Sequence, residues 1–305
     1  MTDPTPPEKQ SAASAARRAT DDPHVFLIPR EALPAGFEDK VAAGDFSPAP
    51  TRPAATVLLV RDSADGPEVL LLRRHRRSGF AADAWVFPGG VVDKADRDLG
   101  LVERMDGPTP MQWAERLGVT DPGEAVAFVV AAVREAFEET GILLARVADD
   151  ATNPGANAQE GLEIARRALL AEVVDLRQII VTRSLRLSAD QLLYLAHWIT
   201  PEPEPRRYDT RFFLARTVAD AVCTPHEAEM TESVWLTARG AVHFFEQGSL
   251  RMLPPTVHTL RRLAGYESVA AIFAALADAP VPALMPAMRP HPDGVAIVLP
   301  DEARG

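Results

Sequence analysis

The segment from Arg134 to Ile142 constrains the fold of this chain more than any other. Wound as a helix, it brings three glutamates, Glu135, Glu138 and Glu139, within about 100° of one another on one face. The opposite face carries an apolar stripe made of Val126, Val129, Val130, Val133 and Phe137. A helix buries such a stripe against a sheet, so the pattern predicts a helix packed on a β-sheet with three carboxylates gathered on its other side.

Electrostatics indicate that this acidic face binds a cation. Carboxylates three or four positions apart lie roughly 5–6 Å from one another, and at an effective dielectric near 20 each ionised pair repels by about 3 kcal/mol. Gly141 is a natural helix terminator, so the acids also lie at the negative end of the helix dipole. Arg134 offsets part of this repulsion. A cluster of glutamates without Cys or His favours Mg²⁺ or Mn²⁺ over Zn²⁺, while a solvated acidic face on an ordinary amphipathic helix remains open.

A second motif lies upstream, where the apolar strand end Trp85–Phe87 runs into Pro88-Gly89-Gly90. Such a turn lets backbone carbonyls approach an ion or a phosphate closely. Together with the acidic helix it resembles the Nudix box, Gly-x5-Glu-x7-Arg-Glu-U-x-Glu-Glu-x-Gly-U, in which U is apolar. The second half of the box matches well, with Ala136 as a small residue at its first apolar position.

The first half of the box departs from the family pattern. About 30 extra residues, roughly 91–122, separate Gly90 from the acidic helix, and we expect them to form an excursion away from the sheet. The first glutamate of the box is left unassigned. Counting forward from Gly90 reaches Asp96, counting backward from the second half reaches Val126, and the nearest glutamate is Glu124.

The resemblance implies a Nudix α/β/α sandwich with a mixed β-sheet, an insertion inside the box and a C-terminal helical extension. It implies that Glu135, Glu138 and Glu139 bind Mg²⁺ or Mn²⁺, with the Gly90 carbonyl as a further ligand, and that Arg134 orients a glutamate of its own helix. The expected reaction is hydrolysis of a diphosphate that links a nucleoside to another group. The metal would neutralise the diphosphate oxygens and activate a water that attacks phosphorus.

The segment from Trp198 to Phe213, with its Thr200-Pro201 and Phe212-Phe213 pairs, is similar to a Nudix subgroup that has an interrupted box. This subgroup includes the peroxisomal coenzyme A diphosphatase type. The resemblance implies coenzyme A or acyl-CoA as substrate, cleaved to 3′,5′-ADP and (acyl-)phosphopantetheine. Asp83 and Gly79 depart from the Gly and Arg that other CoA-cleaving Nudix enzymes carry there. ADP-ribose, NADH and dinucleoside polyphosphates stay open as substrates, as does a non-catalytic nucleotide sensor.

Two further groups of charged residues are candidates for the site. The first is an arginine cluster, Arg73, Arg74, Arg76 and Arg77, which we interpret as a phosphate-binding edge, with a solvated loop as the alternative. The second is a pair of acids, Glu227 and Glu229. In the family a loop before a Glu-x-x-Glu-x-x-Trp strand can supply a further acid, so either residue could be an extra ligand or the general base. Acids on an exposed strand edge are the alternative.

The rest of the chain suggests one large domain with extensions. We expect a disordered tail over 1–22, an N-terminal arm over 23–53, the Nudix domain over 54–245 and a helical, Pro-rich extension over 246–305. Two continuous apolar runs, Ala55–Val60 and Glu68–Leu72, are typical of a strand hairpin buried on both faces.

Composition limits the partners. The net charge of −11, from 43 acidic and 32 basic residues, argues against nucleic-acid binding. The one cysteine, Cys223, excludes a disulfide framework and a cysteine-based zinc site. No apolar run approaches the roughly 18 residues of a membrane span, so we expect a cytoplasmic protein. The predicted partner is a small nucleotide diphosphate, and a homodimer is left open.

Overall fold

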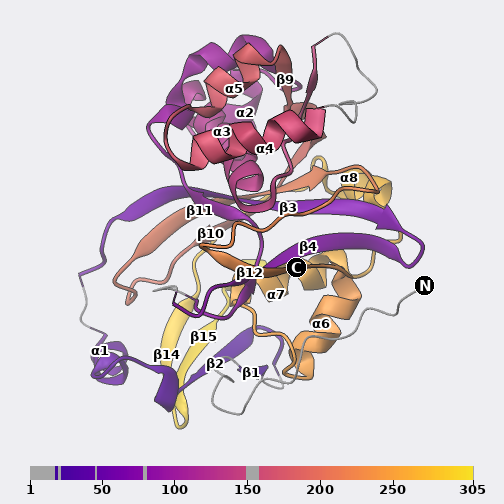
Figure 1. The fold of residues 1–305 in the computed structure, drawn as a ribbon. Helices are drawn as coiled ribbons and strands as arrows, with labels where there is room; N and C mark the ends of the chain where they lie inside the picture. The colour runs from indigo at the N-terminus through magenta and orange to yellow at the C-terminus, as the bar shows by residue number, and fades with distance from the viewer. Residues whose placement is uncertain (1–17, 20–21, 45–46, 78–80, 149–157, 305) are drawn as a thin grey trace.

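The computed structural model describes residues 18–19, 22–44, 47–77, 81–148 and 158–304. Most of the expected tail over 1–22 therefore lies outside the described residues. Figure 1 shows a sheet with α2 to α5 above it and α6 and α7 below it. This is the predicted α/β/α sandwich, and the chain ends on the lower layer.

The central sheet has eight strands in the order β12-β4-β3-β11-β10-β13, with β5 paired to β4 and β6 paired to β3. Its strands are β3 (Thr51–Ser63), β4 (Gly66–Arg74), β5 (Trp85–Val86), β6 (Gly89–Val91), β10 (Leu192–Ile199), β11 (Arg207–Arg216), β12 (Met230–Thr237) and β13 (Ala283–Leu284). Strands β3 and β4 form the predicted antiparallel hairpin, whereas β3 and β11 run parallel. The sheet is therefore mixed, as expected.

Strand β3 is buried on both faces. Val57 and Leu59 belong to the core under α3, while Leu58 and Val60 belong to the core on the opposite face, and all four are fully buried. Successive side chains of a strand point to opposite faces, so a strand between two helical layers needs an unbroken apolar run. This confirms the interpretation of the two apolar runs.

The upper layer is built around α3 (Pro122–Thr140), the helix predicted from the acidic segment. Asp121 caps its start by accepting a 2.8 Å hydrogen bond from the Gly123 N–H, with Pro122 in the first turn. Gly141, at φ 76°, ends it in the left-handed conformation that favours glycine. The other members of the layer are α2 (Pro110–Leu117), α4 (Ala158–Leu170) and α5 (Leu176–Thr182), with a small sheet of β7 (Met105–Asp106), β8 (Ala145–Val147) and β9 (Leu185–Ser188).

The insertion does not leave the sheet as expected. Trp113 of α2 is fully buried, and its ring lies 5.9 Å from that of Phe213 on β11. Three residues of α2, Trp113, Ala114 and Leu117, form an apolar stripe that packs into the core beneath α3. The expectation of an excursion was wrong because the insertion carries its own apolar face, which needs a partner surface.

Helices α4 and α5 are separate, because Asp175 caps α5 through a capping box with Gln178. Strand β10 is preceded by one 3₁₀ turn, η5 (Ala189–Gln191). Earlier 3₁₀ turns in the described chain are η2 (Arg30–Ala32), η3 (Ala95–Arg97) and η4 (Leu99–Arg104).

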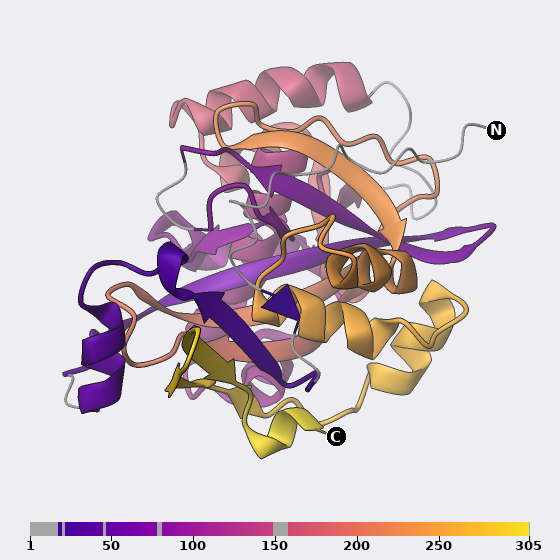
Figure 2. The ribbon, with the colours of Figure 1, turned by 90° about the horizontal axis from the view of Figure 1, so that it is seen from below.

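The lower layer joins the two ends of the chain. Helices α7 (Pro254–Leu263) and α8 (Val269–Leu276) lie in the predicted C-terminal extension over 246–305. Helix α6 (Ala238–Glu246) precedes them, almost entirely within the range predicted for the Nudix domain. A second sheet, in the order β1-β2-β15-β14, consists of β1 (Arg18–Ala19), β2 (Val25–Pro29), β15 (Gly294–Val298) and β14 (Ala287–His291), with α1 (Phe37–Ala43) beside it. Figure 2 shows the indigo N-terminal arm beside the yellow C-terminal strands. A last turn, η6 (Asp301–Arg304), follows.

No helix among the described residues combines the length and the apolar character that a membrane crossing requires.

Candidate active site

The three glutamates occupy the last turns of α3, where Arg134 binds two of them. The Arg134 Nη1 donates to Glu135 Oε1 at 2.8 Å and to Glu138 Oε2 at 2.9 Å. Arg134 is only 7% exposed, so these contacts lie in a poorly solvated region where ion pairs are screened little. Arg134 thus pairs with two glutamates of its own helix.

The insertion supplies a fourth acid, Asp96, which is 1% exposed. Asp96 Oδ1 accepts from Arg134 Nε at 2.9 Å, and Oδ2 accepts from Arg134 Nη2 at 3.0 Å and from the Asp93 N–H at 2.7 Å. Among the three positions considered for the first acid of the box, Asp96 is the one that pairs with Arg134. Val126 is buried in the core, and Glu124 begins α3 about 15 Å along the helix axis from Arg134.

The Gly-Gly turn lies directly against the acids. The Gly89 N–H donates to Glu139 Oε2 at 3.1 Å. A side chain at Gly90 would collide with the Glu135 carboxylate, and one at Gly89 would come within 2.6 Å of the Ala55 carbonyl oxygen. Gly89 therefore requires glycine, because backbone atoms of β3 block a side chain there, whereas a side chain at Gly90 would displace the Glu135 carboxylate.

The acids carry more negative charge than their surroundings balance. Burial raises the pKa of Glu135 to about 7 against the opposing effect of Arg134, and burial also raises the pKa of Glu138. The pKa of Glu139 is raised well above its usual range by burial and by Glu135, while the Gly89 N–H and Arg74 act in the opposite direction. Each raised pKa reports an ionised form that needs more positive charge nearby.

The donor set fits a hard divalent cation. Glu135, Glu138, Glu139 and the Gly90 carbonyl offer only oxygen atoms, which Mg²⁺ and Mn²⁺ prefer, and a cation would relieve the charge imbalance. Within the described part of the chain, no three Asp, Glu, His or Cys side chains converge in a metal-binding geometry. Glu135 and Glu138 instead contact Arg134.

The four arginines of the predicted phosphate edge separate in the structure. Arg73 is already paired, with Asp83 at 2.9 Å and with Glu232 at 2.6 Å. Arg76 and Arg77 are exposed. Arg74 lies close enough to lower the pKa of Glu139, and its buried Nε has no hydrogen-bond partner among the described residues. Arg74 is therefore the arginine best placed to meet a substrate at the acids.

The two candidate acids on the loop before β12 also differ. This loop is fixed to the end of α3, since the His226 N–H donates to the Glu139 carbonyl oxygen at 3.0 Å. Glu229 is exposed and lies close enough to raise the pKa of Glu139. Glu227 is exposed as well, but it lines a separate cavity together with Arg166 and Arg167. Of these two acids, Glu229 is therefore the one that lies near the glutamates at the end of α3.

Arg166 of α4 is a site residue that the sequence did not reveal. Its Nε and Nη2 donate to the Glu138 carbonyl oxygen at 3.0 and 2.8 Å, and the residue is 3% exposed. The guanidinium thus places positive charge at the negative end of α3, next to the acids. Arg166 is 28 positions from Glu138 in the sequence, so no motif spacing links the two residues. The feature of the sequence that could have indicated a buried role is a charged residue on the otherwise apolar face of a predicted helix.

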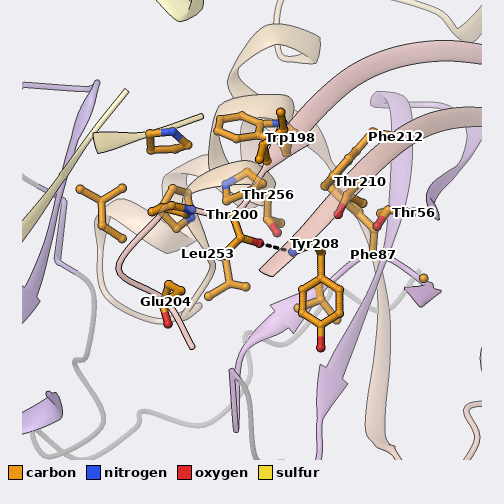
Figure 3. A pocket seen from close by; sticks show the side chains of 18 of the residues that line it. Thr56, Phe87, Trp198, Thr200, Glu204, Tyr208, Thr210, Phe212, Leu253 and Thr256 are labelled. Atoms are coloured by element: carbon orange, nitrogen blue, oxygen red, sulfur yellow. Dashed lines mark hydrogen bonds between the residues drawn. The ribbon is translucent and has the colours of Figure 1, made fainter. Parts of the chain in front are cut away.

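A cavity of about 210 Å³ adjoins the acids on the opposite face of the sheet from α3. Gly89 and Arg74 form the part of its wall nearest Glu139. Figure 3 shows Trp198, Phe87 and Phe212 around it, with Leu253 facing them and Tyr208 hydrogen-bonded through its N–H to Thr200. Residues of the C-terminal extension complete the wall: Leu253, Pro254, Pro255, Thr256, Pro286, Met288 and Ile297.

Comparison with known proteins identifies the family. The family model of the NUDT19 Nudix domain matches residues 98–263, which include the acidic helix α3 and the strands β10, β11 and β12. The chain belongs to the NUDT19 group of the Nudix family. The family resemblance inferred from the interrupted Nudix box is thereby confirmed.

Several relatives named NUDT19 are similar to this chain. The human acyl-coenzyme A diphosphatase NUDT19 is 32% identical over 68% of this chain and 63% of its own length. The Gallus gallus protein of the same name is 30% identical over 72% of this chain and 69% of its own length. The protein of that name from Xenopus laevis is 28% identical over 66% of this chain and 61% of its own length. The chain thus spans slightly less than two thirds of the human and Xenopus relatives.

A solved structure supports the same fold. The crystal structure of a Nudix hydrolase from Alicyclobacillus acidocaldarius superimposes with a TM-score of 0.58 at 26% identity. The superposition covers 76% of this chain and 99% of that protein. The Nudix sandwich therefore accounts for three quarters of the chain.

Proposed function

We propose that this protein is a divalent-metal-dependent hydrolase that cleaves the diphosphate bond of coenzyme A or acyl-CoA, giving 3′,5′-ADP and (acyl-)phosphopantetheine. The observation that carries the proposal is the buried acid cluster at the end of α3, whose charge Arg134 and the Gly89 N–H only partly balance. The choice of coenzyme A rests on the relatives named acyl-coenzyme A diphosphatase.

Each residue of the cluster has a role in this proposal. Glu135, Glu138, Glu139 and the Gly90 carbonyl hold the Mg²⁺ or Mn²⁺. When bound, the metal supplies charge neutralisation at the diphosphate oxygens and a lowered pKa for a bound water. Arg134 fixes the directions of Glu135 and Glu138.

Other residues support the cluster from outside it. Asp96 holds Arg134 in place through two hydrogen bonds. Arg74 lines the cavity and acts on Glu139, and its guanidinium would donate to a phosphate oxygen. Glu229 would accept a proton from the attacking water, since it is exposed and lies beside the cluster.

The test is a substrate panel with a charge-neutral variant. Purified protein is incubated with CoA, acetyl-CoA, ADP-ribose, NADH and a dinucleoside tetraphosphate, with Mg²⁺, with Mn²⁺ or with a chelator. We expect the CoA compounds to be cleaved in a metal-dependent way and Glu138→Gln to lower kcat at least about 100-fold, as loss of a charge-stabilising group does. Glu124→Gln, on the same helix but in its first turn, should keep the wild-type rate.

Three outcomes would overturn parts of the proposal. Cleavage of ADP-ribose, NADH or the dinucleotide without cleavage of CoA would discard the CoA assignment. Tight binding without turnover would indicate a nucleotide sensor. A folded Glu138→Gln variant with the wild-type rate would remove Glu138 from the mechanism.

A further inference from the structure

The cavity beside the acids has a wall of mainly apolar side chains and few charges. Its apolar members are contributed by both the Nudix sheet and the extension: Val86, Phe87, Trp198, Ile199, Phe212, Leu253, Met288 and Ile297, with several prolines. Arg74 and Glu204 are the only charged side chains among its lining residues. A neutral, largely apolar ligand suits such a wall, because burying an unpaired charge is costly.

The cavity also adjoins the site of the reaction. Gly89 belongs to its wall and donates to Glu139, and Arg74 belongs to its wall and acts on the same carboxylate. A diphosphate held at the acid cluster therefore has the cavity directly on one side. One of the two groups joined by that diphosphate would enter it.

The two halves of coenzyme A differ sharply in charge. The nucleotide half carries a 3′-phosphate, which would need cations around it, whereas the pantetheine arm is uncharged and has a dimethyl-substituted carbon and two amides. The single cation of the wall, Arg74, is at the end near the acids, where the diphosphate lies.

We propose that this cavity, closed by the C-terminal extension, is the subsite for the pantetheine arm, and that the nucleotide half lies outside it. The proposal rests on the CoA diphosphatase function proposed above. It gives the extension a role, since Leu253, Met288 and Ile297 of the extension form one wall of the subsite.

The test separates the two halves of the product by inhibition. We would measure the inhibition constants of 4′-phosphopantetheine and of 3′,5′-ADP against CoA hydrolysis for wild type, Leu253→Trp and a matched control, Leu33→Trp. Leu33 is a half-buried leucine of the N-terminal arm that does not line the cavity. Leu253→Trp narrows the cavity, so we expect about a tenfold or larger rise in the phosphopantetheine constant, as for a misfitted group in an apolar pocket. The inhibition constant of 3′,5′-ADP for Leu253→Trp should stay within about twofold of the wild-type value. Leu33→Trp should change neither of the two inhibition constants.

Direct binding of phosphopantetheine and 3′,5′-ADP, measured by calorimetry, gives the same comparison without turnover. A weaker affinity of Leu253→Trp for 3′,5′-ADP alone would overturn the proposal and place the nucleotide in the cavity. Equal affinities of wild type and Leu253→Trp for both ligands would also overturn it. Failure of the wild-type protein to cleave or bind any CoA compound would instead overturn the proposed function, so the two failures are distinguishable.

Discussion

Asp96 offers the sharpest test of how the insertion completes the acid cluster. In Asp96→Asn an amide NH₂ replaces one carboxylate oxygen. Both carboxylate oxygens of Asp96 face N–H groups. Oδ1 accepts a hydrogen bond from Arg134 Nε, and Oδ2 accepts from Arg134 Nη2 and from the Asp93 N–H. The new NH₂ therefore meets a donor in either orientation, and the buried Arg134 loses one of its counterions.

The size of the effect follows from burial. Removing one partner of a buried ion pair costs about 3–5 kcal/mol. Arg134 keeps Glu135 and Glu138, so we expect the lower end, about 3 kcal/mol, which is roughly a 150-fold change in the unfolding equilibrium. The matched control is Asp93→Asn. Its carboxylate is 63% exposed and lies 3.7 Å from Arg134, so we expect a loss below about 1 kcal/mol.

Urea unfolding followed by tryptophan fluorescence measures both variants, since the chain has four tryptophans and Trp113 is buried in the core of the upper layer. A similar, small loss for Asp96→Asn and Asp93→Asn would refute the reasoning, because it would mean that Asp96 is not the buried counterion of Arg134.

Two further predictions follow from the same site. Arg166→Met should lower the free energy of unfolding by about 2–3 kcal/mol, because it removes two charged hydrogen bonds from the Glu138 carbonyl. Arg167→Met, at an exposed position, should cost under about 0.5 kcal/mol in the same urea assay, and equal losses would contradict a capping role for Arg166. In chelator, the folded state keeps the Glu135 proton up to a pKa of about 7, above the usual glutamate pKa of 4.5. The unfolded state thus binds fewer protons between these values, so this residue's contribution to stability is present below pH 4.5 and is lost as the pH rises to 7. Stability curves of wild type and Glu135→Gln should differ in slope in that window, and parallel curves would contradict the raised pKa.

Much of the fold and the centre of the site could be predicted from local patterns. The apolar stripe, the Asp121 cap and the Gly141 terminator together define α3 within the sequence itself. The unbroken apolar runs of β3 and β4 indicate burial on both faces without knowledge of the covering helices. Each of these features is determined by residues close together in the sequence, so it can be predicted without knowledge of the tertiary structure.

Contacts between distant residues could not be predicted. Strand β2 pairs with β15, at the other end of the chain, and neither strand has a period that reveals its partner. Asp96 and Arg166 reach the acid cluster through tertiary packing, from the insertion and from α4. Arg73 looked equivalent to Arg74, but its neighbours Asp83 and Glu232 already neutralise it. Such pairings depend on register and packing, which one sequence does not encode locally.

The most direct test of the account is mass-spectrometric identification of the products formed from an acyl-CoA with Mg²⁺ in ¹⁸O-labelled water. The account predicts 3′,5′-ADP and acyl-phosphopantetheine in equal amounts, with one labelled oxygen on one of the two new phosphates, and no reaction with Glu138→Gln. Release of free CoA and a fatty acid, or an intact acyl-CoA, would contradict it.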